Sequence, residues 1–304
     1  MDYIILIFAV IALYQLYQFL KWRSVQLDFS GKVVFLTGGS SGIGEELTKK
    51  FIALGAKKVI IASRNVAEME RVKKESGAPS KVEILQMDLN KPDECLEITK
   101  TFVSRADVQS EGIDVLVNNA GVTMRQQFVN FDFATCQMMM NTNCMSHIAI
   151  TKAFLPLLIK QKRGKIVNVI SVAGLIGTGF RTMYSSAKYG IAGFFKALRF
   201  EVQQHGIEIT NIYPEFVKTA ISKNAHMGSG KTFGKTDTNI QKGIPVEKAV
   251  ETMLKAVQLG ERELIVGRAL YHVVPHLCFW SSAINRVVGK IAYKQSLKSI
   301  AEAE

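Results

Sequence analysis

The sequence has little cysteine, proline or tryptophan: 4, 6 and 2 of its 304 residues. The cysteines are far apart and show no metal-ligand spacing, so no metal site or disulfide scaffold is predicted; they are Cys95, Cys136, Cys144 and Cys278. No Asn-x-Ser/Thr sequon occurs, which disfavours a glycosylated lumenal face. Internal repeats and low-complexity runs are also lacking. These absences favour one domain of about 240 residues with two terminal extensions, its thiols in a reducing compartment.

Acidic residues are also scarce, since 26 of them face 38 lysines and arginines and leave a net charge of +12. A basic chain can bind nucleic acid, but no recognition motif or aromatic-basic platform is present, so no nucleic-acid partner is predicted. A more localised pattern lies in the tail at 271–304. Its basic residues recur every four positions and its apolar residues take another face: Arg286, Lys290, Lys294 and Lys298 against Ile284, Val287, Val288 and Ile291.

Such an amphipathic basic helix suits an anionic membrane surface, and the alternative is a solvated helix end. The aromatic residues before it, Tyr271, Phe279 and Trp280, suit a membrane interface as well. They would equally close a pocket or pack against a partner subunit.

Residues 3–20 form an apolar run interrupted only by Gln15 and Gln18. At about 1.5 Å per residue the run spans roughly 27 Å, close to a bilayer core of about 30 Å. No small-residue cleavage site follows, which favours a retained single-pass anchor at 1–24 over a removed signal peptide; a docked amphipathic helix is the alternative. Lys21 and Arg23 follow the run while only Asp2 precedes it, so the rest of the chain is expected in the cytosol.

A glycine loop follows the first expected strand. Residues 32–37 read KVVFLT, then GGSSGIG, then the helical pattern EELTKKFIALG. A strand–glycine turn–helix unit lets the backbone approach a pyrophosphate at the helix N-terminus. Gly38, Gly42 and Gly44 therefore predict dinucleotide binding, because both the strand and the helix that confirm such a motif are visible.

The end of the second expected strand, KKVIIAS, carries Arg64 and no acidic residue. At this position an acid bonds a bare ribose 2′-hydroxyl, whereas an arginine accommodates a 2′-phosphate. NADP(H) is therefore favoured over NAD(H). The alternative is an ordinary surface arginine after a strand.

Ser171, Tyr184 and Lys188 carry the chemistry that the sequence predicts. Tyr184 and Lys188 stand at i and i+4, which places them on one helix face. A nearby ammonium favours the phenolate and lowers the pKa of tyrosine, so Tyr184 can exchange a proton with an alcohol or carbonyl. Ser171 would stabilise charge on the same substrate oxygen. The alternative is a tyrosine and a lysine without a catalytic role on a solvated helix face.

Strands are expected at 32–37, 58–62, 82–87, 113–117, 164–170, 207–212 and 262–266, with helices between them, including 133–161 and 183–204. This alternation predicts an α/β fold: a Rossmann-type, doubly wound parallel sheet. Ligands bind such sheets beyond the carboxyl ends of the strands, where the motif residues fall.

Over about residues 30–270 the chain resembles the classical branch of the short-chain dehydrogenase/reductase family. The matching motifs are TGGSSGIG at 37–44, Asp88-Leu89, NNAG at 118–121 and Asn143, together with the serine, tyrosine and lysine above. The impression is strongest for membrane-anchored members, the dehydrogenase/reductase member 7 group and the microsomal hydroxysteroid dehydrogenases. The 3-ketosphinganine reductases share the GGSSGIG loop and an anchor.

The resemblance implies roles for individual residues. Tyr184 would be the acid/base, Lys188 would also hold the nicotinamide ribose, and Asn143 would hold a relay water. Asp88 would contact the adenine, and Thr219 the carboxamide. The implied cofactor-binding set is Gly38, Ser40, Ser41, Gly42, Ile43, Gly44, Arg64, Asp88, Leu89, Asn118, Ala120, Gly121, Tyr184, Lys188, Pro214, Val217 and Thr219.

One position departs from the family pattern, which usually has Pro-Gly after the sixth strand. Here Glu215 follows Pro214, and it would either favour the oxidised cofactor or point to solvent. The segment 221–244 falls where the family has its substrate-binding loop. The predicted substrate contacts are Ser171, Tyr184, Phe180, Met183, Phe216 and Met227.

These expectations describe a membrane-anchored, NADP(H)-dependent oxidoreductase. It would interconvert a carbonyl and a secondary alcohol on a lipophilic substrate such as a steroid or retinoid, at the endoplasmic reticulum. One alternative is a 3-ketosphinganine-type keto-lipid reductase, and another is a non-catalytic structural or cofactor-sensing subunit of a membrane complex. By analogy, the helices at 133–161 and 183–204 would form a homodimer.

Overall fold

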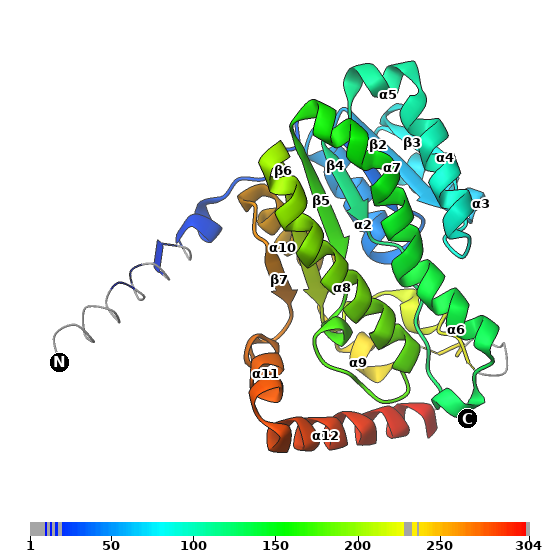
Figure 1. Ribbon diagram of the computed structural model, residues 1–304, viewed down its shortest axis with the longest axis vertical. Helices are drawn as coiled ribbons and strands as arrows, with labels where there is room; N and C mark the ends of the chain where they lie inside the picture. Colours follow the sequence, from blue (N-terminus) through cyan, green and yellow to red (C-terminus); the bar gives the residue numbers. More distant parts are fainter. Residues whose placement is uncertain are drawn as a thin grey trace.

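The computed structural model describes residues 10, 13, 16–17, 20–227, 233–235 and 237–301, with side chains given up to residue 297. Seven parallel strands form one sheet in the order β3-β2-β1-β4-β5-β6-β7 (Figure 1). The strands are β1 (Val33–Thr37), β2 (Lys58–Ser63), β3 (Val82–Gln86), β4 (Val115–Asn118), β5 (Gly164–Val169), β6 (Ile207–Pro214) and β7 (Glu263–Val266). The predicted doubly wound parallel sheet is thus confirmed.

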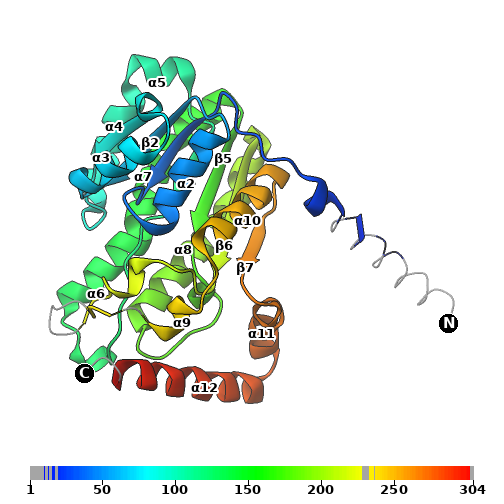
Figure 2. The same cartoon turned by 180° about the vertical axis from the view of Figure 1, so that it is seen from behind.

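Helices cover both faces of the sheet (Figures 1 and 2). One face packs against α2 (Gly42–Ala53), α3 (Val66–Glu75) and α10 (Val246–Leu259), and the other against α4 (Pro92–Ser104), α7 (Ser146–Gln161) and α8 (Thr182–Val202). Alternate residues of β1 enter the two cores: Phe35 joins one, and Leu36 the other. Burial on both faces explains why these strands are apolar throughout.

The helix expected at 133–161 is interrupted. α6 (Phe133–Met140) passes through a π-helical turn, η3 (Asn141–Met145), into α7. No glycine or proline marks the turn in the sequence NTNCM. Single π turns inside helices are frequent at functional sites, and Asn143 stands in the middle of this one.

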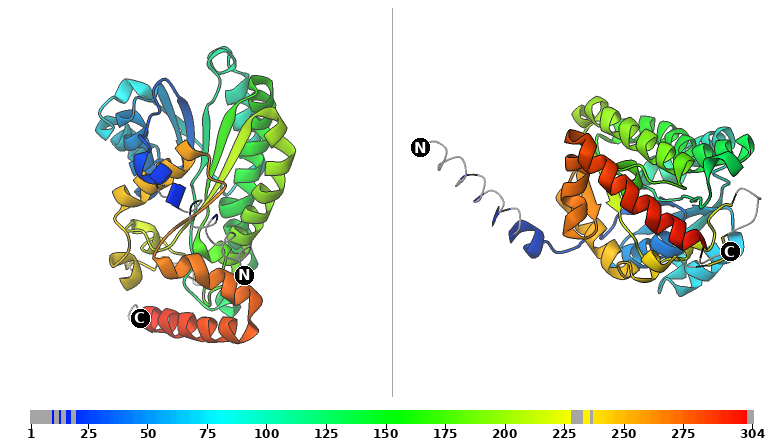
Figure 3. Two further views of the ribbon diagram at one scale, coloured as in Figure 1. Left: turned by 90° about the vertical axis from the view of Figure 1, so that its left-hand side faces the viewer. Right: turned by 90° about the horizontal axis from the view of Figure 1, so that it is seen from below.

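The C-terminal extension forms two helices, α11 (Ala269–Trp280) and α12 (Ser282–Ala301). α12 lies across the end of the molecule toward which the strands point, as the view from below shows (Figure 3). Shorter elements complete the chain: α5 (Ala106–Glu111), α9 (Thr238–Gln241) and the 3₁₀ turns η1 (Pro79–Lys81), η2 (Phe128–Asn130), η4 (Val172–Gly174), η5 (Gln203–His205) and η6 (Ala220–Ser222).

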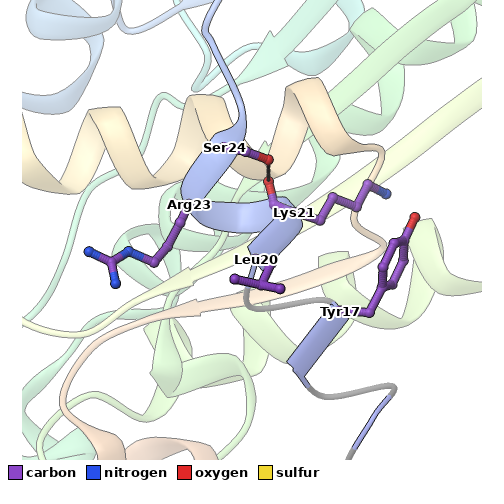
Figure 4. A pocket seen from close by; sticks show the side chains of 5 residues that line it. All are labelled: Tyr17, Leu20, Lys21, Arg23 and Ser24. Carbon is purple, nitrogen blue, oxygen red and sulfur yellow. Dashed lines mark hydrogen bonds between the residues drawn. The ribbon is translucent and has the colours of Figure 1, made fainter.

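The predicted anchor at 1–24 lies largely outside the described residues. Its described end carries Tyr17, Leu20, Lys21, Arg23 and Ser24, which line a shallow hollow (Figure 4). This hollow shares no residue with the predicted site at the carboxyl edge of the sheet. Within the described part of the chain, no helix has the length and apolarity needed to cross a membrane.

The first test concerns the core. Phe154 is fully buried, and its ring centroid lies 4.8 Å from that of Phe35 and 6.3 Å from that of Phe102. Phe154→Ala should lower the free energy of unfolding by about 3–5 kcal/mol, measured by urea denaturation, because it leaves a cavity. Phe200→Ala is the control, since Phe200 is 66% exposed and its loss should change stability by less than about 0.5 kcal/mol. Equal losses would contradict the packing.

Candidate active site

The glycine loop turns tightly at the carboxyl end of β1. Gly38 has φ of 72°, and a Cβ there would lie 2.8 Å from the Cα of Ala120. A Cβ on Gly44 would lie 2.0 Å from the carbonyl oxygen of Gly38. The loop therefore requires glycine at both positions, and it leads directly into the first turn of α2. Open backbone N–H groups at that turn suit a pyrophosphate.

The loop after β4 braces the glycine loop. The Thr37 hydroxyl accepts hydrogen bonds from the backbone N–H groups of Asn119 and Ala120 at 3.0 and 3.1 Å. The Asn119 side-chain amide donates to the carbonyl oxygens of Thr37 and Gly38 at 3.0 and 3.3 Å. Asn119 is thus a site residue that the sequence argument missed, although it is the second asparagine of NNAG.

Asn118, predicted to line the cleft, directs its side chain into the core. It is 1% exposed, and its amide donates to Asn168 at 2.9 Å and to Thr151 at 3.2 Å. Asn168 in turn donates to Asn211 at 2.9 Å. The three asparagines form a buried polar row across β4, β5 and β6, so the part of Asn118 near the cleft is its backbone.

Arg64 and Asp88 stand at the ends of β2 and β3, beside the glycine loop. The Nε of Arg64 lies 3.8 Å from an Asp88 carboxylate oxygen, and the Arg64 side chain is 64% exposed. The hydroxyls of Ser40 in the loop and Ser63 in β2 are 3.0 Å apart, which ties the strand end to the loop. Leu89 is buried, and its carbonyl accepts from Ser146. Arg64 is therefore placed to meet a phosphate near the loop.

Ser171, Tyr184 and Lys188 come together at the end of β5. Ser171 caps η4 and accepts a hydrogen bond from the N–H of Ala173 at 3.1 Å. Tyr184 and Lys188 lie on α8 and are 9% and 3% exposed. The Lys188 ammonium donates to the carbonyl oxygen of Val169 at 3.3 Å and lies 5.7 Å from the Tyr184 ring centroid. The three side chains thus lie together at the carboxyl end of β5.

The pKa of Tyr184 differs from the expectation of a value lowered by Lys188. Burial raises the pKa of Tyr184, while the Ser171 hydroxyl and the charges of Arg181 and Arg125 act to lower it. Burial lowers the pKa of Lys188 to about 8. In this arrangement the cations that favour the phenolate are two arginines that the sequence argument did not single out.

The π turn holds Asn143 against the NNAG loop. Its side-chain oxygen accepts from the N–H of Val122 at 3.1 Å, and its amide donates to the Met139 carbonyl at 2.9 Å. A Cβ on Gly121 would lie 2.8 Å from that oxygen and 3.5 Å from the Lys188 Nζ. Gly121 therefore sits between Asn143 and Lys188, and the three predicted residues are neighbours.

Glu215 does not point to solvent. Its side chain is only 4% exposed and forms an ion pair with Arg268, whose Nε donates to it at 2.9 Å. The backbone N–H of Arg268 donates to the second carboxylate oxygen at 3.0 Å. The expectation that Glu215 points to solvent was wrong, because the carboxylate joins the end of β6 to the start of α11. Its expected effect on the oxidised cofactor stays a prediction.

The remaining predicted cofactor contacts lie in the segment after β6 and in the glycine loop. Pro214 is the last residue of β6. Val217 is buried and pairs with Ile244 in an isolated bridge. Thr219 caps η6, and its methyl carbon would lie 3.2 Å from a Cβ on Gly42. Ser41 precedes α2, and Ile43 packs on the core. Thr219 thus borders the glycine loop.

The predicted substrate contacts lie around Tyr184. Met183 packs on a cluster that contains Tyr184, Met124 and Met139. Phe180 is buried with φ of 63°, and its ring stacks on Tyr293 of α12 with centroids 5.2 Å apart. The ring of Phe216 lies 5.7 Å under the Arg181 guanidinium. Met227 is half-buried at the edge of the described segment.

A glycine loop at a helix N-terminus, with a serine, a tyrosine and a lysine at the same edge of the sheet, is the arrangement expected of a dinucleotide-dependent dehydrogenase or reductase. Comparison with known proteins agrees. A family model described as short chain dehydrogenase matches residues 32–229. The chain therefore belongs to the short-chain dehydrogenase/reductase family and is an oxidoreductase.

Among its relatives is a dehydrogenase/reductase SDR family protein 7-like of Drosophila melanogaster, 33% identical, with 95% of this chain and 90% of the relative covered. A solved metagenomic short-chain oxidoreductase in complex with NADP is 29% identical, with a TM-score of 0.56 and coverage of 61% and 83%. A short chain dehydrogenase from Burkholderia cenocepacia in complex with NADP has a TM-score of 0.67 at 22% identity, covering 83% and 94%. The resemblance to the member 7 group is thus confirmed.

The Glu215–Arg268 pair yields a second prediction. Arg268→Met should lower the free energy of unfolding by about 1–3 kcal/mol, because it leaves a buried carboxylate without its counter-ion. In a Glu215→Gln background, Arg268→Met should lower the free energy of unfolding much less. Urea denaturation of the two single variants and the double variant measures this coupling. Strictly additive losses would contradict a direct interaction.

Proposed function

We propose that this oxidoreductase uses NADP(H) to interconvert a carbonyl and a secondary alcohol. The observation that carries the proposal is the convergence of Ser171, Tyr184 and Lys188 beside the glycine loop. The NADP complex of the metagenomic relative supports the choice of cofactor. So does Arg64, whose exposed guanidinium stands at the end of β2, where the sequence has no acidic residue, and lies 3.8 Å from Asp88 beyond β3.

The cofactor fits the residues present, because the glycine loop is a cradle that any added Cβ would obstruct at Gly38 and Gly44. The loop and the first turn of α2 would hold the pyrophosphate, Arg64 the 2′-phosphate, and Lys188 the nicotinamide ribose. The bound nicotinamide supplies or accepts the hydride. Everything else in the reaction is positioning and proton transfer by the chain.

Tyr184 would donate the proton to the carbonyl oxygen during reduction and accept it back during oxidation. The Ser171 hydroxyl would donate a hydrogen bond to that oxygen as negative charge develops on it. Arg181 and Arg125 supply the positive field that favours the phenolate and opposes the effect of burial on the pKa of Tyr184. Asn143, wedged against Gly121 near Lys188, would hold the water that returns a proton to this corner.

A lipophilic substrate is supported by the apolar wall around Tyr184, in which Met124 and Met139 are buried and Met183 is half-buried. A membrane-facing role is supported by the C-terminal helices. Phe279 and Trp280 of α11 are 81% and 82% exposed, and Val287 and Ile291 of α12 are more than half exposed. The basic residues Arg286, Lys290 and Lys294 are also exposed on α12. Apolar and basic side chains together suit an anionic lipid surface.

The third test removes the proton donor. Tyr184→Phe keeps the ring but not the hydroxyl, so turnover should fall at least about 100-fold while NADPH affinity is unchanged. Turnover is measured as NADPH oxidation with a panel of steroid, retinoid and 3-keto-lipid carbonyls. NADPH affinity is measured by fluorescence titration. Tyr189→Phe, at a 45% exposed position on the same helix, is the control and should be fully active. Turnover retained by Tyr184→Phe would refute the mechanism.

The fourth test addresses the cofactor. Arg64→Ser should weaken NADP⁺ binding about 10- to 100-fold, because charge-assisted hydrogen bonds to the 2′-phosphate are lost. NAD⁺ binding should be nearly unchanged. Dissociation constants for both cofactors measure the effect, with Arg163→Ser as control at a 61% exposed position. If the two cofactors weaken equally, Arg64 does not read the phosphate.

A further inference from the structure

Two arginines are buried beside Tyr184 against one carboxylate. Arg125 follows β4, Arg181 precedes α8, and Asp237 caps α9. One oxygen of Asp237 lies 3.5 Å from the Arg125 Nη2 and 3.7 Å from the Arg181 Nη2. The side chains of Arg125, Arg181 and Asp237 are 5%, 15% and 2% exposed. Charges are seldom buried to this degree unless they meet a partner.

The two guanidinium groups keep open donors. The Nη1 of Arg125 donates to the Thr123 hydroxyl at 3.2 Å and to the Met124 carbonyl at 3.0 Å, whereas the contacts of both groups with Asp237 are longer. Charge-assisted N–H···O bonds are usually about 2.7–2.9 Å long, so 3.5 and 3.7 Å are loose contacts. The second oxygen of Asp237 already accepts the backbone N–H of Asn239 at 2.8 Å. Within the described part of the chain, the buried Nε atoms of both arginines have no hydrogen-bond partner.

The charges do not balance. Arg125 and Arg181 repel one another, and both are attracted by the single carboxylate of Asp237. Burial and this repulsion lower the pKa of Arg125 to about 9, and burial lowers that of Arg181. An added anion would remove the repulsion and occupy the open donors at once.

The pair borders the apolar cluster that contains Tyr184. Both guanidinium groups act electrostatically on Tyr184. Met124, the neighbour of Arg125, belongs to the apolar cluster around Tyr184, and Arg181 stands over the ring of Phe216. A ligand bound against this cluster would therefore meet apolar side chains, the Tyr184 hydroxyl and two cations.

We propose that Arg125 and Arg181 form an anion-recognition site, and that the substrate is an amphipathic carbonyl compound bearing a carboxylate or phosphate. The planar guanidinium groups would bind the anionic oxygens through two or more N–H groups, while the apolar part lies on Met124, Met139 and Met183. This narrows the class of lipophilic substrates and rests on the proposed function. Asp237 holds the two arginines in place when the anion is absent.

Binding of non-reacting probes tests the site without relying on turnover. The full-length protein saturated with NADP⁺ is titrated calorimetrically with octanoate, octyl phosphate, octanol and inorganic phosphate. One of the anionic octyl compounds should bind about 10- to 100-fold tighter than octanol, and inorganic phosphate alone should bind weakly. Equal affinities of the octyl compounds would overturn the proposal. Inorganic phosphate binding as tightly as octyl phosphate would overturn its amphipathic part.

Variants assign the effect to the arginines. Arg181→Met should abolish the preference for the anion, whereas Arg163→Met, at an exposed position, should keep it. Asp237→Asn retains a cap for α9 and removes the competing carboxylate, so it should strengthen anion binding. NADP⁺ affinity is measured for each variant as a control. An unchanged value shows that the variant is folded, whatever the result for the anion.

Kinetics distinguish recognition from an effect on the proton donor. A keto acid and its methyl ester are compared as substrates. Arg181→Met should raise KM for the keto acid about 10-fold or more and leave the ester nearly unchanged. Equal losses of kcat for acid and ester, with a shifted pH profile, would show that Arg181 serves only Tyr184 and would refute the proposal. Absence of turnover in the parent protein would refute the proposed reaction but not the calorimetric result.

Discussion

The active site depends on the hydrogen bonds between the end of β1 and the loop after β4. Thr37 and the Asn119 amide lock the glycine loop to the NNAG loop, and Gly38 lets the two backbones meet at van der Waals distance. The loop after β4 continues to Gly121 and Val122, which lie against Asn143 and near Lys188. A parallel sheet collects the ends of distant strands at one edge, but it is this local bonding that brings the loops into one wall.

The strands and most motif residues could be predicted because they are local signals. Each strand is an apolar run buried on both faces, and the expected ranges agree with the observed strands to within two residues or so. The i, i+4 spacing correctly placed Tyr184 and Lys188 in one buried corner. The spacing could not predict the direction of the Lys188 ammonium, because that group donates to the Val169 carbonyl at the end of β5 and not to the Tyr184 hydroxyl.

Other features depend on partners remote in the chain. Glu215 appeared to be a defect in a cofactor wall because Arg268, its counter-ion, is 53 residues away. Arg125, Arg181 and Asp237 lie on three separate elements, and no local pattern joins them. The π turn at Asn143 also has no sequence marker, because it is stabilised by contacts with the NNAG loop rather than by a breaker residue.

The Glu215–Arg268 pair makes the C-terminal helices part of the catalytic domain. Arg268 is the residue directly before α11, and further along the chain Tyr293 of α12 stacks on Phe180, four residues before Tyr184. A force on α11 or α12 would therefore act at two places, the end of β6 and the segment of Phe180 that precedes α8. Contact of these helices with another body would act on the surroundings of Tyr184 as well as on the end of the sheet.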